Sequence, residues 1–212
     1  MKYIVRQTDS VPDFTDWFGG AWEKAQIAQI AVFHAESSPR NRPETEVKLL
    51  HDSSSIYVFF RVIDPFILGR YTRFNEPVYT DSCVEFFFSP GEGQGYFNVE
   101  TNCLGTQLMS HVKAGNAVRF SKEEGSSIKA VPIITGPDQQ TGKMVWTLGY
   151  VLHMELFQKY VSDLIPLSGK EWRGNFYKCG DDLPEPHWAS WAPIGPELQF
   201  HVPEYFAPVI FE

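Results

Sequence analysis

Cysteine is scarce in this chain of 212 residues, and positive charge is outnumbered by negative charge. The cysteines are Cys83, Cys103 and Cys179, and their odd number and wide spacing exclude a disulfide framework and a CxxC zinc motif. Lysine and arginine total 18 against 26 aspartates and glutamates, which gives a formal net charge of −8. Because phosphate backbones and anionic lipids repel an acidic protein, neither a nucleic acid nor a membrane is an expected partner.

Long apolar runs are also absent, which excludes a membrane-spanning helix. The N-terminal residues 1–7 turn polar too early for a signal peptide, so the chain as written is expected in the cytoplasm, or in the periplasm or medium if a signal has been removed. The glycine-rich segment 91–95 precedes no helical pattern and therefore indicates a hairpin loop. No nucleophile elbow, phosphate-binding loop or HExxH motif occurs.

Hydrophobic residues make up 43% of the chain and aromatic residues 15%, which is ample material for a core built of strands. No linker or repeat interrupts residues 1–212, so we expect a single domain. One short helix is predicted around Glu155–Val161. About ten strands with almost no helix predict an all-β fold, a two-sheet antiparallel β-sandwich. The expected strands are Tyr3–Arg6, Val47–His51, Ile56–Ile63, Cys83–Ser89, Tyr96–Asn102, Gln107–Val112, Ala117–Phe120, Ser127–Ile134, Met144–Leu152, Asn175–Cys179 and Ala207–Phe211.

The most informative segment is the hairpin predicted over residues 83–102. Side chains alternate across a strand, so burying Val84, Phe86 and Phe88 together with Phe97 and Val99 fixes the register. The opposite, outward face then carries the polar side chains of the hairpin, which are Glu85, Asn98, Glu100 and Asn102. The same register turns Cys83 outward and Cys103 inward, so we predict that they form no disulfide.

This polar face admits more than one interpretation. An antiparallel sheet commonly leaves one face in water, and the four side chains would then be an ordinary solvated surface. Alternatively, Glu85 and Glu100 could be the acid and the nucleophile or base of a glycoside hydrolase. A haem- or partner-binding sandwich is a third alternative, although no axial Met/His pair is evident. Elsewhere, Trp22, Trp146 and Trp172 are predicted to pack in the core.

Several motifs of this chain, in the same order and spacing, resemble the family-9 carbohydrate-binding modules of xylanases and their longer single-domain relatives. The motifs are Gly20-Ala21-Trp22, Pro43, Val47–Asp52, Ile56–Val62 with Asp64, Asp81–Phe87, Gly95–Asn102 with Gly105, Trp172–Cys179, Pro186–Trp191 and Phe200–Glu204. The resemblance implies a jelly-roll-like fold and non-catalytic binding of a terminal sugar of a plant-type polysaccharide, such as xylan or glucan, in carbohydrate catabolism.

The resemblance also implies which residues bind the sugar. The first aromatic ring lies six residues before the motif glutamate, which places it at Tyr79 with the glutamate at Glu85. The second ring is a late tryptophan, placed at Trp191 with Trp188 as second choice. Well-studied members carry tryptophan where this chain has Tyr79. The expected secondary contacts are Asn98, Glu100, Asn102 and Arg173.

A monomer that requires no cofactor is expected. Members of the family can carry structural calcium, and turn-like aspartates could supply oxygen ligands, but no ligand set follows from the sequence. The aspartates considered are Asp64, Asp81, Asp181 and Asp182.

Overall fold

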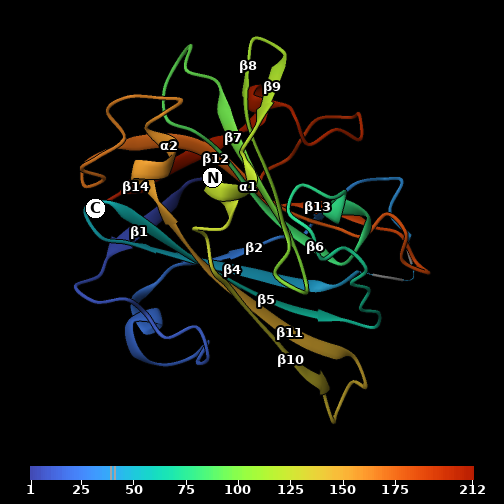
Figure 1. The fold of residues 1–212 in the computed structure, drawn as a ribbon. Helices are drawn as coiled ribbons and strands as arrows, with labels where there is room; N and C mark the ends of the chain where they lie inside the picture. Colours follow the sequence, from blue (N-terminus) through green and yellow to red (C-terminus); the bar gives the residue numbers. More distant parts are fainter. Residues whose placement is uncertain (39, 41) are drawn as a thin grey trace.

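The computed structural model describes residues 1–38, 40 and 42–212, and β-strands dominate it (Figure 1). Short apolar segments bounded by turn residues form these strands, as the sequence pattern predicts. The strands are β1 (Tyr3–Gln7), β2 (Ile27–Gln29), β3 (Val32–Phe33), β4 (Glu44–His51), β5 (Ser55–Asp64), β6 (Cys83–Ser89), β7 (Tyr96–Asn102), β8 (Gln107–Lys113), β9 (Asn116–Arg119), β10 (Ala130–Pro137), β11 (Met144–His153), β12 (Glu171–Cys179), β13 (Trp188–Ser190) and β14 (Ala207–Phe211).

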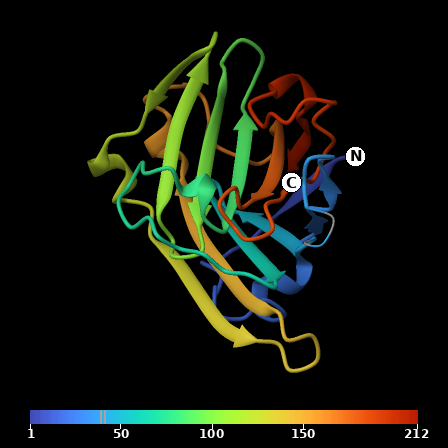
Figure 2. The same ribbon diagram turned by 90° about the vertical axis from the view of Figure 1, so that its right-hand side faces the viewer.

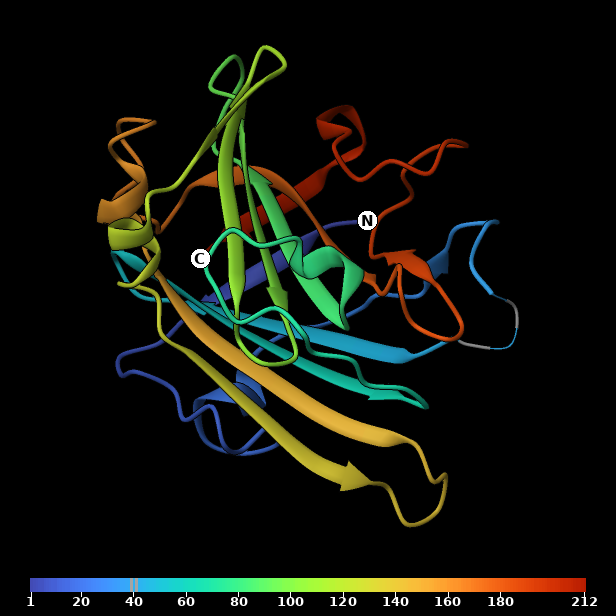
Figure 3. The ribbon, with the colours of Figure 1, turned by 45° about the vertical axis from the view of Figure 1, so that its right-hand side comes forward.

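Hydrogen bonds join most strands into one path, in the order β10-β11-β5-β4-β1-β14-β12-β6-β7-β8-β9. Strand β1 makes this path continuous, because Tyr3–Val5 pair in parallel with β14 whereas Arg6 and Gln7 pair in parallel with β4. Short strands β2, β3 and β13 attach beside the path. The all-β prediction is confirmed. The two separate sheets expected from the sequence are instead the two halves of one curled sheet, which cross each other in Figure 3.

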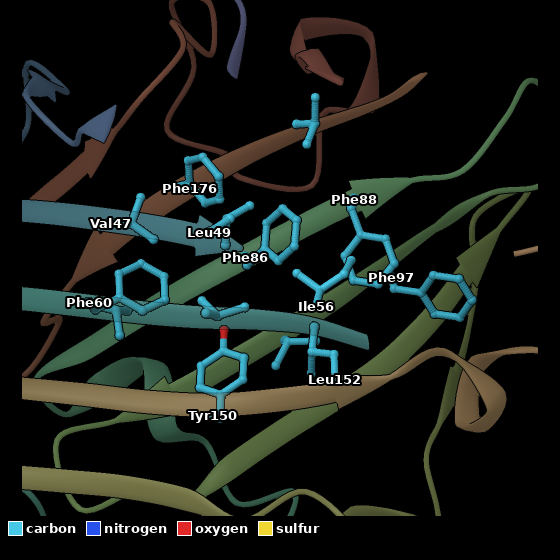
Figure 4. Packing of buried hydrophobic residues seen from close by; sticks show 14 of the residues in the cluster. Val47, Leu49, Ile56, Phe60, Phe86, Phe88, Phe97, Tyr150, Leu152 and Phe176 are labelled. Atoms are coloured by element: carbon cyan, nitrogen blue, oxygen red, sulfur yellow. The ribbon is translucent and has the colours of Figure 1, made fainter. Parts of the chain in front are cut away.

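The main core lies between these two halves. Phe86, Phe88 and Phe176 of the β6–β12 half pack with residues of β4, β5 and β11, such as Phe60 and Tyr150 (Figure 4). Each buried ring of this size stabilises the fold by about 1.5–3 kcal/mol. The prediction that Trp22, Trp146 and Trp172 are core residues is confirmed, since each exposes 2% of its surface or less.

Several strand boundaries differ from the sequence prediction, and two of these differences have local reasons. Strand β10 begins at Ala130 rather than Ser127, because Ser127 closes the preceding helix α1 (Lys122–Gly125) by donating its backbone N–H and its hydroxyl to the Glu124 carbonyl. Strand β12 begins at Glu171 rather than Asn175, since residues 171–174 pair with β14. Asp52 closes the β4–β5 turn, because its Oδ1 accepts the backbone N–H groups of Ser54 and Ser55.

Helices are few and short in the described residues. The helix expected at Glu155–Val161 is present only as α2 (Met154–Phe157), because Gln158 already ends the helical hydrogen bonding. The remaining short helices are the 3-10 turns η1 (Gly20–Lys24), η2 (Val78–Thr80) and η3 (Pro203–Tyr205). Within the described ranges, every helix is too short to cross a membrane.

Candidate functional site

The outward face of β6 and β7 carries the polar side chains that the sequence analysis placed there. In the observed register Glu85 is opposite Glu100, Phe87 opposite Asn98, and Cys83 opposite Asn102. The predicted register is therefore confirmed, and Cys83 and Cys103 are both free thiols. The face is not the solvated surface considered as an alternative, because Glu85, Asn98 and Glu100 each expose 5% or less.

An apolar group covers one end of this face. Phe87, Tyr96 and Tyr177 pack there with Ile194 and Phe206 of the C-terminal segment, which Figure 2 shows in red beside the strands. The C-terminal segment therefore covers this end of the sheet and contributes a wall beside the glutamates. The fold thus turns a flat sheet face into a walled depression.

This depression is a pocket of about 780 Å³. Its floor is formed by strands β6 to β9 and β12, and its walls by η2, the start of β13 and the loop around residues 198–201. The residues that line it are Tyr79, Glu85, Tyr96, Asn98, Glu100, Leu108, Ser110, Val112, Gly115, Ala117, Arg119, Cys179, Asp181, Trp188, Leu198, Gln199, Phe200 and His201.

The two glutamates of the floor are held by defined hydrogen bonds. The Cys179 thiol donates to Glu85 Oε1 over 3.0 Å, and Asn98 Nδ2 donates to Glu100 Oε1 over 2.7 Å. In the described residues, Asn98 Oδ1 is buried with no hydrogen-bond partner. Because each acid uses one oxygen for these contacts, its second carboxylate oxygen remains for a ligand.

Burial raises the pKa of both glutamates. For Glu85 the loss of hydration is the largest cause, and the electrostatic interactions with Cys179 and Glu100 add to it. Burial raises the pKa of Glu100 to about 7, although the Asn98 hydrogen bond and Arg119 oppose this shift. The pKa of Asp181 is raised by burial as well, and the hydrogen bond from Trp188 opposes it. Protons are therefore bound at this floor near neutral pH.

Two aromatic side chains, those of Tyr79 and Trp188, line the pocket wall. Tyr79 lies in η2 and is 40% exposed, and Trp188 lies at the start of β13 and is half-buried. The Trp188 indole N–H donates to Asp181 Oδ1 over 2.8 Å, which fixes the ring orientation. Of the residues expected to bind sugar, the structure brings Tyr79, Glu85, Asn98, Glu100 and Trp188 together around one pocket.

A buried polar cluster next to Trp188 holds β13 in place. Lys178 Nζ lies 2.7 Å from His187 Nε2 and donates to the Cys179 carbonyl over 2.9 Å. Burial and the neighbouring Lys178 lower the pKa of His187 to about 2, so the imidazole is neutral and Nε2 accepts from the ammonium. Asp64 Oδ2 lies 3.5 Å from Lys178 Nζ. This cluster fixes the residue that directly precedes Trp188.

Asn102 supports the site without lining it. Its Nδ2 donates to Asp81 Oδ2 over 2.9 Å, and Asp81 also accepts from Arg70 Nε over 3.0 Å. Asp81 is fully buried and directly follows η2. The prediction that Asn102 contacts the sugar is therefore replaced by a positioning role, in which Asn102 and Asp81 hold the turn that carries Tyr79.

Two further expected contacts lie outside the pocket. Trp191 exposes only 4% and packs in the main core against Tyr3 and Phe176, with ring centroids 6.2 and 5.4 Å away. Its backbone N–H donates to the Phe176 carbonyl, which turns the ring inward. Arg173 donates to the Phe206 carbonyl and lines a separate depression near Tyr96. The structure thus corrects the choice between the tryptophans, because only Trp188 reaches the pocket.

The sequence analysis missed several pocket residues. Ser110 and Arg119 face the pocket because β8 pairs with both β7 and β9, placing Ser110 opposite Asn98 and Arg119 opposite Ser110. The period-two alternation of these strands would have identified both. Phe200 and His201 lie in a loop, where no periodicity marks them. His201 Nδ1 is 2.8 Å from the Tyr96 hydroxyl, and burial lowers the pKa of His201.

Metal ligation has limited support in the described part of the chain. Cys83, Glu85 and Cys179 place their ligand atoms within 4.8 Å of one another. However, burial raises the pKa of the Cys83 thiol to about 12 and that of the Cys179 thiol well above its ordinary value, so both thiols hold their protons.

The aspartates considered for calcium do not form a shared site. Asp81 and Asp182 both pair with the Arg70 guanidinium, and Asp64 lies beside Lys178. Asp181 accepts the Trp188 indole N–H instead, so among the described residues these aspartates have separate partners and do not converge as calcium ligands.

The described residues form an all-β fold with a pocket that has aromatic side chains in its wall and acidic side chains in its floor. Residues 21–211 match the model of carbohydrate-binding family 9, and the chain belongs to this family. No curated protein sequence matches it.

Solved structures are similar over the whole chain. One is the crystal structure of a protein from Bacteroides uniformis ATCC 8492 that is provisionally assigned as carbohydrate-binding. It is 27% identical to this chain with a TM-score of 0.86, and the alignment covers 100% of this chain and 99% of that protein. A family-9 module from Caldicellulosiruptor kristjanssonii in complex with glucose is 12% identical with a TM-score of 0.66. The alignment covers 100% of this chain and 96% of that module. The complex with cellotriose has a TM-score of 0.64 at 12% identity, covering 100% and 94%. The two Caldicellulosiruptor structures show likeness of fold alone.

Proposed function

We propose that this protein binds carbohydrate without cleaving it, and that it holds a terminal sugar between Tyr79 and Trp188 over the floor of Glu85, Asn98 and Glu100. The observation that carries this proposal is the pocket itself, whose lining combines the aromatic side chains of Tyr79 and Trp188 with a buried polar floor. Membership of carbohydrate-binding family 9 supports it. So do the similar folds that were solved with glucose and with cellotriose.

The chemistry of the pocket suits a pyranose ring. The C–H faces of such a ring are apolar and its rim consists of hydroxyl groups, so aromatic side chains bury the faces while polar side chains bind the rim. Each buried polar group left unpaired costs about 1–3 kcal/mol, which makes Glu85, Asn98 and Glu100 the source of selectivity. We expect dissociation constants in the range of about 1 μM to 1 mM.

The positions of Glu85 and Glu100 favour binding over hydrolysis. A glycoside hydrolase places its two carboxyl groups on either side of the scissile bond, with one acid ionised and the other protonated. Glu85 and Glu100 are direct cross-strand partners on one face, so they reach the same side of a ligand. Burial also raises the pKa of both glutamates, whereas a hydrolase needs one of its two acids ionised.

The ligand we favour is the end of a plant-type chain such as a glucan or xylan, bound by a monomer that serves polysaccharide breakdown. A pocket closed by the 198–201 loop suits a chain end better than the middle of a polymer, because a terminal ring can enter a depression that has walls on several sides.

Calorimetric titration with glucose, cellobiose, xylose and xylobiose tests this function. Tyr79→Ala should weaken binding about tenfold or more, because the ring supplies both buried area and stacking. Tyr205→Ala is the matched control, since Tyr205 is 43% exposed against 40% for Tyr79 and does not line the pocket. Absence of binding to all four sugars, or release of sugar from the oligosaccharides, would contradict the proposal.

A further inference from the structure

Glu100 presents one free oxygen to the pocket. Its Oε1 accepts a hydrogen bond from Asn98 Nδ2 over 2.7 Å. Its Oε2 has no partner among the described residues and, unlike the enclosed Asn98 Oδ1, can be reached from the pocket that Glu100 lines. Because Oε1 already serves as the acceptor, a proton on this carboxyl group belongs on Oε2, the oxygen that a ligand meets.

The surroundings of Glu100 do little to stabilise a negative charge. Glu85 lies directly opposite on β6, and like charges at such a cross-strand position destabilise each other. Arg119 is the single lysine or arginine among the described lining residues, and it is exposed on the edge strand β9. Glu100 itself exposes only 5%. Burial is accordingly the largest cause that raises the pKa of Glu100 to about 7.

A bound sugar strengthens the preference for the neutral acid. The sugar displaces the remaining water above Glu100, and a neutral sugar brings no cation to compensate a buried carboxylate. It does bring acceptors, because its ring oxygen and glycosidic oxygen carry no hydrogen. A carboxylic acid donates its O–H to such an oxygen, whereas a carboxylate has no donor.

We propose that Glu100 binds the sugar as a neutral carboxylic acid, whose Oε2–H donates to an oxygen of the sugar, so that binding requires a proton on this side chain. This inference rests on the proposed function and assigns a specificity-determining donor within the same site. A neutral glucan or xylan end supplies the acceptor that this donor needs. Asn98 is the positioning residue, since its N–H directs the proton of Glu100 toward the ligand.

The neighbouring groups do not change charge in the same pH range in a way that would oppose this effect. The other titratable groups around the two glutamates are Cys83, Tyr96, Arg119, Tyr150, Tyr177, Cys179, Asp181 and His201. Burial raises the pKa of the cysteines and tyrosines in this set and lowers that of His201, so all of them are neutral between pH 7 and pH 8. Burial also raises the pKa of Glu85, so its ionisation acts in the same direction as that of Glu100.

The affinity for sugar should therefore fall as the pH rises. The protonated form of Glu100 predominates below a pKa of about 7, and at about pH 8 only about a tenth of it remains. Because the apparent dissociation constant is divided by the competent fraction, binding should weaken about tenfold between pH 6 and pH 8. Above pH 7 the protein should take up protons from solvent when the sugar binds.

The test is calorimetric titration at about pH 6, 7 and 8 with whichever of glucose, cellobiose, xylose and xylobiose binds most tightly, in two buffers of different ionisation enthalpy. Circular dichroism at each pH checks that the protein is folded. Glu100→Gln carries a neutral N–H donor at every pH, so it should remove most of the pH dependence and of the proton uptake. Glu155→Gln, the same change at an exposed glutamate of α2, should retain both.

The outcomes separate this inference from the function on which it rests. An affinity that stays constant or rises from pH 6 to pH 8, or a release of protons on binding, would overturn the donor role of Glu100 and leave carbohydrate binding intact. Failure of all four sugars to bind at every pH would overturn both. If Glu100→Gln does not fold, the proton uptake of the wild-type protein still decides between a donating acid and an accepting carboxylate.

Discussion

At the scale of single residues, Trp188 and Trp191 lie close together in the sequence but have different roles in the structure. Trp188 opens β13 and reaches the pocket, whereas Trp191 follows β13 and packs against Tyr3 and Phe176. Trp191→Ala should lower the free energy of unfolding by about 3–5 kcal/mol, because it leaves a large cavity in the core. Trp188→Ala should cost less stability and abolish sugar binding. Urea denaturation and titration of both variants check this, and the reverse pattern would contradict the placement of the two rings.

The raised pKa of Glu100 predicts that the stability of the protein depends on pH. Its pKa is raised from 4.5 to about 7 in the folded protein, so between these pH values the folded state binds more protons than the unfolded state. The free energy of unfolding therefore falls as the pH rises through this window, by about 3 kcal/mol at most. Urea denaturation across the window should show this fall, and Glu100→Gln should reduce it. If the free energy of unfolding instead rises with pH in both the wild type and the variant, this would contradict the raised pKa of Glu100.

At the scale of elements, the turn η2 depends on one buried aspartate. Asp81 binds Arg70 and Asn102, and its side chain is fully buried, whereas Asp182 binds the same Arg70 with a side chain that is 51% exposed. Asp81→Ala should lower the free energy of unfolding by about 3–5 kcal/mol and weaken sugar binding through Tyr79. Asp182→Ala, the matched control, should cost about 1 kcal/mol or less. Equal effects of the two changes would argue against this role of Asp81.

The β6–β7 hairpin also shows what the sequence could predict. Alternation of apolar side chains fixed its register, so the shared face of Glu85, Asn98 and Glu100 followed from the sequence alone. The burial of that face did not, because the C-terminal loop that covers it has no periodic pattern. The choice of Trp191 over Trp188 failed for the same reason: both lie in a segment with a strand of only three residues.

At the scale of the whole molecule, β1 determines the architecture. Its change of partner from β14 to β4 joins the halves of the curled sheet, and a parallel pairing between the two ends of the chain has no local signature in the sequence. Because the halves are joined there, the sheet curls over its core and the outer face of β6 to β9 remains available for a pocket. A sequence pattern can thus predict the strands and the all-β class, but the long-range pairing requires the structure.

The central claim is that a sugar binds in the pocket of Glu85 and Trp188. The most direct measurement is nuclear magnetic resonance of the tryptophan indole N–H groups during titration with glucose, with the Trp188 signal assigned from Trp188→Phe. Trp188 donates this N–H to Asp181 in the pocket wall, while Trp191 is buried in the core. We predict that the Trp188 signal shifts in a saturable manner and that the Trp191 signal does not. A shift of Trp191 with Trp188 unchanged, or no shift at saturating glucose, would contradict the account.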